Sequence, residues 1–176
     1  GESESGLNER LDPVIARLEG VGNPTLAFLA SGWEGIKVRL TAKAATEPDA
    51  LVLLGTWEAE VRLLVDDIVF GADEETMESV VLGLLRERGL TLGLAESVTG
   101  GLVAGRITAI PGASEVFRGG IVSYATGVKH DLLGVPEGPV VSEAAAAAMA
   151  TGAQRALKCD VALSLTGVAG PTEQDG

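Results

Sequence analysis

Several features that mark other classes of protein are scarce or missing in this sequence. It has a single cysteine, Cys159, so no disulfide can form within the chain, and a cytoplasmic location is the expectation. Aromatic residues make up only 3% of the chain, so the core must be built from aliphatic side chains. No apolar run approaches the roughly 20 residues that a transmembrane helix needs, and residues 1–5 lack the pattern of a signal peptide. We therefore expect no membrane partner.

Clusters of basic residues are missing as well. The net charge is −12; residues 1–90 hold 17 acids against 8 bases, and residues 91–176 hold 8 acids against 5 bases. Proteins that bind a nucleic-acid backbone do so through grouped Lys and Arg side chains, so we expect no direct binding of nucleic acid. The simpler explanation of the excess of acidic residues in the first half is that they favour solubility.

Residues 1–71 predict a small α+β domain in the order α-β-β-α-β. The expected elements are a helix at 3–19, strands at 25–30 and 35–41, a helix from Glu47, and a third strand at 67–70. No concentrated chemistry is found in this block. Lys37, Arg39 and Lys43 could contact an anion, but a solvated strand face is the simpler interpretation.

Residues 72–176 predict a three-layer α/β/α domain with a mostly parallel sheet. The expected strands lie at 92–95, 119–125 and 159–165, and the expected helices at 73–88, 102–107, 127–133 and 143–156. Buried strands that alternate with helices in this way are typical of α/β folds. Ser142 is expected to cap the last, alanine-rich helix.

The stretch that organises the second domain is Thr91–Thr108, in which an apolar strand turns into a helix through Glu96-Ser-Val-Thr-Gly-Gly101. Such a corner brings hydroxyl groups and free backbone N–H groups to a helix N-terminus. That arrangement suits an anion, or the negative charge that develops on a carbonyl group under attack. A simpler interpretation stays open, in which Ser97 or Thr99 only caps the helix.

Ligands of parallel α/β sheets collect beyond the carboxyl ends of the strands. The predicted strands end near Ser97, Tyr124 and Thr166, so we expect these residues to share one rim. Lys129 follows Tyr124 on the next helix, at a separation that lets both face Ser97. A serine nucleophile needs a base, which a lysine can supply, and a tyrosine can relay or orient the proton. Taken singly, Lys129 is more typical of a surface lysine and Tyr124 of a strand-end aromatic.

Two further features allow simple interpretations. The only histidine, His130, has no acidic neighbour except Asp131, so we expect a solvated His130 and no Ser-His-Asp triad.

The loop Thr166–Gly170 places glycines at a strand end, where backbone N–H groups can approach a phosphate closely. A tight structural turn explains the same loop equally well.

Several motifs taken together resemble the CinA family of competence/damage-inducible proteins. They are Ala95-Glu-Ser-Val-Thr-Gly-Gly101, Gly120-Ile-Val-Ser-Tyr124 with Lys129, Leu133-Gly-Val135, Val141-Ser-Glu143 and Leu165-Thr-Gly-Val-Ala-Gly-Pro171. Their order over residues 72–176 is similar to that of the C-terminal nicotinamide-nucleotide amidase domain. Residues 1–71 resemble the linking region that precedes this domain. The resemblance implies that the chain corresponds to the back part of such a protein, without its N-terminal molybdopterin-binding-like domain.

This resemblance implies an activity and a set of site residues. The activity is hydrolysis of the carboxamide of nicotinamide mononucleotide to nicotinic acid mononucleotide and ammonia, by a homodimer without metal ion or organic cofactor. The nucleophile is carried over to Ser97, and base or relay roles to Tyr124 and Lys129. Contacts with the small-molecule nucleotide substrate are implied for Thr99, Gly100, Gly101, Thr166, Gly167, Val168, Ala169 and Gly170.

The sequence departs from the family pattern at two places. Position 98 is Val where the family commonly has Cys, which we expect to alter packing only. The chain ends at Gly176, whereas the family continues into a further strand and a final helix, so a domain truncated at its C-terminus is expected. The alternative to an amidase is a non-catalytic nucleotide-binding or dimerisation module of a larger protein, and release of ammonia separates the two.

Overall fold

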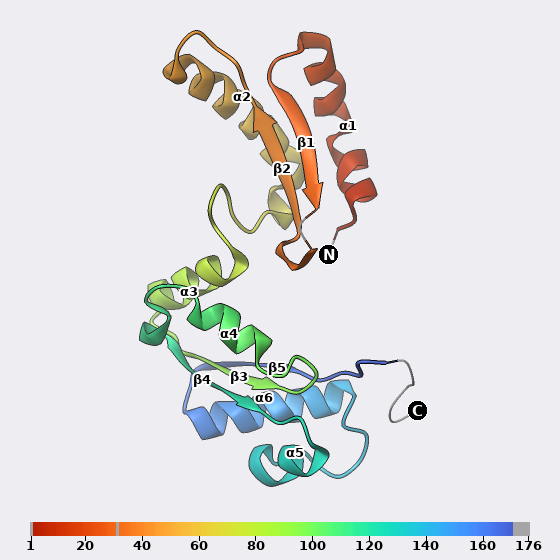
Figure 1. Cartoon of the computed structure of the whole chain (residues 1–176), viewed down its shortest axis with the longest axis vertical. Helices are drawn as coiled ribbons and strands as arrows, with labels where there is room; N and C mark the ends of the chain where they lie inside the picture. Colours follow the sequence, from red (N-terminus) through yellow and green to blue (C-terminus); the bar gives the residue numbers. More distant parts are fainter. Residues whose placement is uncertain (1, 31, 171–176) are drawn as a thin grey trace. The chain divides into compact units, whose positions relative to one another are not determined.

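The computed structural model describes residues 2–30 and 32–170 of the chain (Figure 1). The chain divides into two compact units, Gly1–Met77 and Glu78–Gly176. Each unit has its own sheet and its own apolar core. Among the described residues, no helix is long and apolar enough to cross a lipid bilayer.

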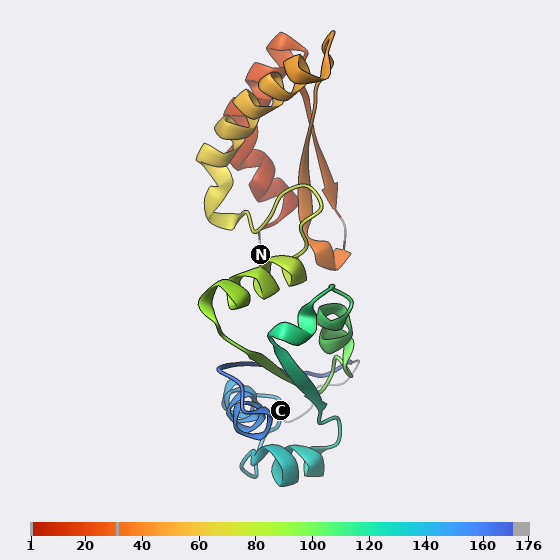
Figure 2. The same cartoon turned by 90° about the vertical axis from the view of Figure 1, so that its left-hand side faces the viewer.

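The first unit packs two helices against one face of a two-stranded antiparallel sheet (Figure 2). Its elements are α1 (Glu4–Val21), β1 (Thr25–Ala30), β2 (Ile36–Thr41) and α2 (Glu47–Val65), with short 3₁₀ helices at Gly32–Glu34 and Asp66–Ile68. The two helices begin at side-chain caps, because Ser3 accepts a hydrogen bond from the N–H of Gly6 and Thr46 from that of Asp49. Alternate residues of both strands face the core, as the sequence pattern predicts.

The third strand predicted at 67–70 is wrong, so the first unit has the order α-β-β-α. Its residues continue α2 as the 3₁₀ turn Asp66–Ile68, which the N–H of Val69 closes on the carbonyl of Asp66 at 3.3 Å. The Arg10 guanidinium of α1 donates to the Leu64 carbonyl and to the Asp67 carboxylate, and so holds this turn against α1. An apolar run of three residues without a partner strand does not outweigh these local hydrogen bonds.

The second unit is a three-layer α/β/α domain, as the sequence predicts. Its elements are α3 (Met77–Arg88), β3 (Leu92–Glu96), α4 (Leu102–Thr108), β4 (Phe117–Val122), α5 (Thr126–Leu133), α6 (Glu143–Leu157) and β5 (Val161–Leu165), with a 3₁₀ helix at Ala113–Glu115. The three strands are all parallel in the order β4-β3-β5, so β3 lies in the middle. Figure 1 shows α3 and α4 on one side of this sheet and α5 and α6 on the other.

Two apolar clusters fill the spaces between the layers. Leu82 of α3, Leu94 of β3 and Ile107 of α4 belong to the first cluster. Ala95 of β3, Leu133 of α5 and Met149 of α6 belong to the second. Leu94 and Ala95 are neighbours that point to opposite faces, and both are fully buried, as expected for a central strand of a parallel sheet.

A glycine fixes the distance between α5 and α6. A Cβ atom built on Gly152 would lie 2.1 Å from the carbonyl oxygen of Leu133, so no larger residue fits there without a backbone shift. The close approach sets the position of α5, which carries Lys129.

The structure also corrects the start of α3 and shows where the single cysteine lies. The helix begins at Met77, not near Asp73, because Asp73 adopts a left-handed conformation with φ 53° and the Glu75 carboxylate accepts the N–H of Ala72. Cys159 is buried just before β5, and burial raises the pKa of its thiol, in keeping with a small apolar residue.

Candidate active site

The carboxyl ends of the three parallel strands are joined by hydrogen bonds that continue past the sheet. The N–H of Ser97 donates to the carbonyl of Leu165 at 2.9 Å, and the N–H of Ser123 donates to the carbonyl of Glu96 at 2.8 Å. The first residue beyond the central strand β3 is therefore held to the end of β5, and the first residue beyond β4 is held to the end of β3. This is the rim on which the sequence predicts a site.

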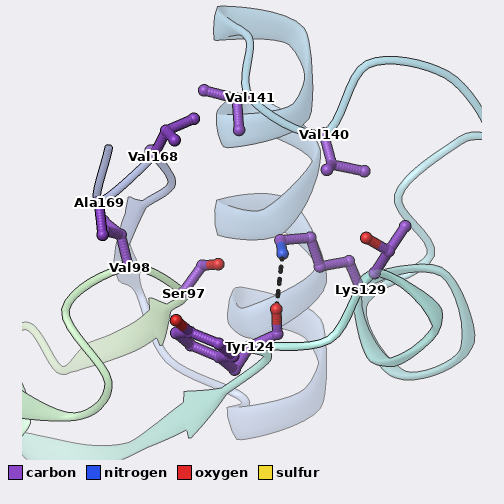
Figure 3. A pocket seen from close by; sticks show the side chains of 10 residues that line it. Ser97, Val98, Tyr124, Lys129, Val140, Val141, Val168 and Ala169 are labelled. Carbon is purple, nitrogen blue, oxygen red and sulfur yellow. Dashed lines mark hydrogen bonds between the residues drawn. The ribbon is translucent and has the colours of Figure 1, made fainter. Parts of the chain in front are cut away.

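A pocket opens at this rim, between the ends of β3 and β5 and the first turn of α5 (Figure 3). Its lining consists of Ser97, Val98, Tyr124, Thr126, Lys129, Val140, Val141, Gly167, Val168 and Ala169. The structure thus brings Ser97, Tyr124 and Lys129 together beside the loop that follows β5, as the argument from the strand ends expects.

Ser97 is nearly buried and directs its hydroxyl into the pocket. The residue is 5% exposed, and within the described ranges the hydroxyl makes no hydrogen bond. The N-cap of α4 is Gly101, at φ 100°, and no side chain of that residue caps the helix. The interpretation of Ser97 or Thr99 as a helix cap is therefore wrong, and the hydroxyl of Ser97 is available to a ligand.

Lys129 is buried, although a lysine in a short polar helix is more typical of a surface. It is 3% exposed, and its ammonium donates a hydrogen bond to the carbonyl oxygen of Tyr124 at 3.3 Å. In Figure 3 this ammonium and the Ser97 hydroxyl point into the same space. The Lys129 side-chain nitrogen and the Ser97 hydroxyl therefore share one pocket.

Tyr124 is exposed, in contrast to Ser97 and Lys129. Its side chain is 69% exposed, and its contact with Lys129 is made by its backbone carbonyl. Figure 3 shows the ring below Ser97, with the phenol oxygen directed away from Lys129. The ring therefore forms a wall of the pocket mouth in this arrangement.

The anion that occupies the corner is part of the protein itself. The fully buried carboxylate of Glu96 accepts the N–H of Gly101 and of Val103, both at 3.1 Å, and that of Ala104 at 2.7 Å. The N-terminus of α4, which the sequence offers as a place for a ligand anion, is therefore already filled.

These contacts keep Glu96 ionised. Burial raises the pKa of its carboxyl, but the nearby Thr99 hydroxyl and the three amides together lower the pKa by more than burial raises it. The net pKa therefore lies below the ordinary range. The Thr99 hydroxyl lies beside the carboxylate without the geometry of a good hydrogen bond.

Two backbone donors stay open next to Ser97. The N–H of Gly100 donates to the Ser97 carbonyl at 3.0 Å, and the N–H of Leu102 donates to the Thr99 carbonyl at 3.1 Å. Within the described residues, the N–H groups of Val98 and Thr99 donate to no protein atom. Of these two residues only Val98 lines the pocket, so the corner offers a ligand fewer amides than its sequence suggests.

Several residues predicted to bind substrate do not line the pocket. Gly167, Val168 and Ala169 line it, whereas Thr99, Gly100, Gly101, Thr166 and Gly170 do not. The Thr166 hydroxyl donates to the Val140 carbonyl at 2.8 Å and so ties the loop after β5 to the segment before α6. The substrate-binding roles of these segments stay predictions.

His130 lies outside the pocket, and its environment differs from the expected one. The ring is half-buried, and its Nδ1 lies 2.7 Å from the carbonyl oxygen of Val135, which makes Nδ1 the donor. The expectation of a solvated His130 is therefore wrong. It contributes no base to Ser97.

Sequence reasoning missed four lining residues. Thr126 carried a signal, since its hydroxyl opens a helix two residues after the strand-end Tyr124. Val98, Val140 and Val141 carried none, because an apolar side chain in a loop does not reveal which cavity it will line. Residues 2–30 and 32–170 contain no group of three or more His, Cys, Asp or Glu residues that could hold a metal ion.

Comparison with known families accounts for both units. Residues 74–176 match the family model of the CinA C-terminal domain, and residues 1–71 match that of the KH domain of the damage-inducible protein CinA. The chain belongs to the CinA family. The family resemblance predicted from the sequence is therefore confirmed.

Relatives of this CinA chain extend well beyond it. A CinA-like protein of Frankia casuarinae is 48% identical over 180 residues, which cover 99% of this chain and 41% of the relative. The chain thus spans about two fifths of the length of that curated relative.

Solved structures resemble the fold over part of the chain. The competence/damage-inducible protein CihA of Agrobacterium tumefaciens is 36% identical, with a TM-score of 0.51 over 60% of this chain and 67% of its own. A CinA superfamily protein of Escherichia coli is 34% identical, with a TM-score of 0.52 over 60% of this chain and 66% of its own.

Proposed function

We propose that this CinA chain contributes an amidohydrolase site that converts nicotinamide mononucleotide to nicotinic acid mononucleotide and ammonia, with Ser97 as the nucleophile. The observation that carries the proposal is the convergence of a buried serine hydroxyl and a buried lysine amine in one pocket. Lysines are rarely this buried, and this one shares its pocket with a serine hydroxyl that makes no hydrogen bond within the described chain.

In the first step the Ser97 oxygen attacks the carboxamide carbon, and its proton passes to an unprotonated amine of Lys129. The carbonyl oxygen then carries a negative charge. Collapse of this intermediate breaks the C–N bond, and Lys129 returns the proton to the leaving nitrogen, which departs as ammonia. Water attacks the resulting ester, and the same lysine accepts and returns a proton as Ser97 is released.

The open amide of Val98 suits the negative charge of the intermediate, because Val98 lines the pocket. It directly follows the nucleophile in the chain and donates to no other described group. Donors fixed before the reaction stabilise an oxyanion without the cost of reorganisation. Glu96 accepts the amides of Gly101, Val103 and Ala104, and backbone carbonyls accept those of Gly100 and Leu102. The amide of Val98 is therefore the open donor that the corner supplies at the pocket.

The pocket walls suit a flat aromatic ring that carries an amide, such as the pyridinium ring of the proposed substrate. Val98, Val140, Val141 and Val168 supply apolar surface, and Tyr124 supplies an aromatic face at the mouth. Ser97, Thr126 and Lys129 supply polar groups to the same pocket. A lining that combines apolar walls with convergent polar groups is typical of a small-molecule site.

The proposal includes surroundings that follow from the family resemblance. We expect a cytoplasmic homodimer that acts on a small nucleotide without a metal ion, an organic cofactor or bound nucleic acid. A non-catalytic nucleotide-binding module is the competing function, and it would bind the nucleotide without releasing ammonia.

The test is ammonia release from nicotinamide mononucleotide by the wild-type chain and by two serine variants. Ser97→Ala removes the attacking oxygen and leaves the backbone donors, so release should fall to the background while nucleotide binding survives. Ser123→Ala is the matched control, because Ser123 is equally buried at a strand end but does not line the pocket. Binding by the wild type without ammonia release, or equal rates in the two variants, would refute the proposal.

A further inference from the structure

One buried charge in the second unit takes no part in the proposed chemistry. Glu96 is the last residue of the central strand β3, is 0% exposed, and directly precedes Ser97. A buried carboxylate is costly unless it is fully hydrogen-bonded, so its presence here needs a reason.

The carboxylate binds the first turn of α4 and not the pocket. Its Oε2 accepts the N–H groups of Gly101 and Val103, and its Oε1 accepts that of Ala104. Because successive strand residues point to opposite sides, Glu96 faces α4 while Ser97 faces the pocket. Hydrogen bonds from backbone N–H groups to an ionised acceptor are about twice as strong as neutral ones.

These bonds fix the path of the segment that holds the nucleophile. The segment Ser97–Gly100 is anchored at its first residue by the hydrogen bond from the Ser97 N–H to the Leu165 carbonyl. It is anchored directly after its last residue by the bond from the Gly101 N–H to Glu96. With both ends fixed, Ser97 is held at the pocket, and the amides of Val98 and Thr99 donate to no other described group.

We infer that Glu96 is a positioning residue for the nucleophile: by binding the first turn of α4 it holds the Ser97–Gly100 segment in the conformation that aims the Ser97 hydroxyl into the pocket. This inference rests on the proposed function. Glu96 touches no substrate, so its loss should change how fast the bound amide reacts and not how tightly the nucleotide binds.

Glu96→Gln is the main variant, because it keeps the shape of the side chain. An amide oxygen can replace only one of the two carboxylate oxygens, and the NH₂ group would face backbone donors. Displacement of a catalytic group by about 1 Å can cost about 100-fold in rate. We therefore expect kcat for ammonia release to fall about 100-fold, with KM changed less than twofold.

Glu78→Gln is the matched control. Glu78 is a second, largely covered carboxylate that holds α4, through an ion pair with Arg106 in the last turn of that helix. Its loss should lower the melting temperature but leave kcat within twofold, since it does not touch the first turn of α4. Glu96→Asp keeps the charge on a shorter side chain and should give a kcat between those of Glu96→Gln and the wild type.

The outcomes separate the two proposals. A wild-type chain without ammonia release refutes the proposed function, and the inference with it. An active wild type in which Glu96→Gln and Glu78→Gln keep similar kcat values refutes the inference alone. An increase of KM at unchanged kcat in Glu96→Gln also refutes it. If Glu96→Gln does not fold, Glu96→Asp decides: a wild-type kcat in that variant overturns the inference, and a reduced kcat at unchanged KM supports it.

Discussion

Replacement of Lys129 by methionine should affect activity much more than stability. Burial of the lysine nitrogen lowers the stability of the fold, whereas the proposed reaction needs that nitrogen as a base. Methionine has nearly the same length and keeps the packing of the buried stem. The variant loses the hydrogen bond from Nζ to the Tyr124 carbonyl, together with every further contact of that nitrogen, and a hydrogen bond contributes about 0.5–3 kcal/mol. It also removes the cost of burying a polar nitrogen at 3% exposure, which is about 1–3 kcal/mol. Because these effects have opposite signs, the melting temperature should stay within a few degrees of the wild-type value.

The rate should behave in the opposite way. A positioned general base contributes about 10²–10⁴-fold, so ammonia release should fall by that factor, which corresponds to about 3–5 kcal/mol in the barrier. Lys37→Met is the control, since Lys37 is an exposed residue of β2 and should leave rate and stability unchanged. The reasoning is refuted if Lys129→Met keeps a rate within threefold of the wild type, or if its activity is lost only because it unfolds.

Two further predictions concern the stability of the second unit. Because the pKa of Glu96 is lowered in the folded chain from its ordinary value of 4.5, its stabilising contribution is complete well above pH 4.5 and is lost as the pH falls through the folded pKa. Urea unfolding should therefore show a stability gap between wild type and Glu96→Gln that is wide at pH 7 and narrows below pH 4.5; a constant gap would contradict this. Gly152→Ala should lower the free energy of unfolding by about 1–3 kcal/mol or more, because the new Cβ would meet the Leu133 carbonyl oxygen at 2.1 Å. Gly83→Ala, in open space on α3, is the control for the same urea measurement, and equal stability of the two variants would contradict the packing argument.

Most of the fold could be predicted because its signals are local. Alternation in β2, the continuous apolar run of β3 and the cap at Ser142 each act within a few residues, and each appears in the structure where expected. The segment 67–70 was mispredicted because its conformation depends on Arg10, which lies 57 residues away from Asp67 in the sequence. A short apolar run cannot reveal such a long-range contact.

The site could be predicted in outline but not in its electrostatics. The rule that ligands lie at the carboxyl ends of parallel strands was enough to bring Ser97, Tyr124 and Lys129 to one place. The sequence could not reveal that the Glu96 carboxylate accepts the amides of α4. Side chains of a strand alternate between the two faces of the sheet, and the sequence does not show which face Glu96 points to. Nor could it show that Lys129 is buried, since burial depends on the packing of α5 against α6.

The central claim is that the Ser97 oxygen forms a covalent bond to the acyl group of the amide. The most direct measurement is acid quenching of the chain during turnover of nicotinamide mononucleotide, followed by peptide mass spectrometry. We predict an ester of the nicotinic acid mononucleotide acyl group on the peptide that contains Ser97, and no such ester in Ser97→Ala. An acyl group on a different residue, or turnover by Ser97→Ala at the wild-type rate, would contradict the account.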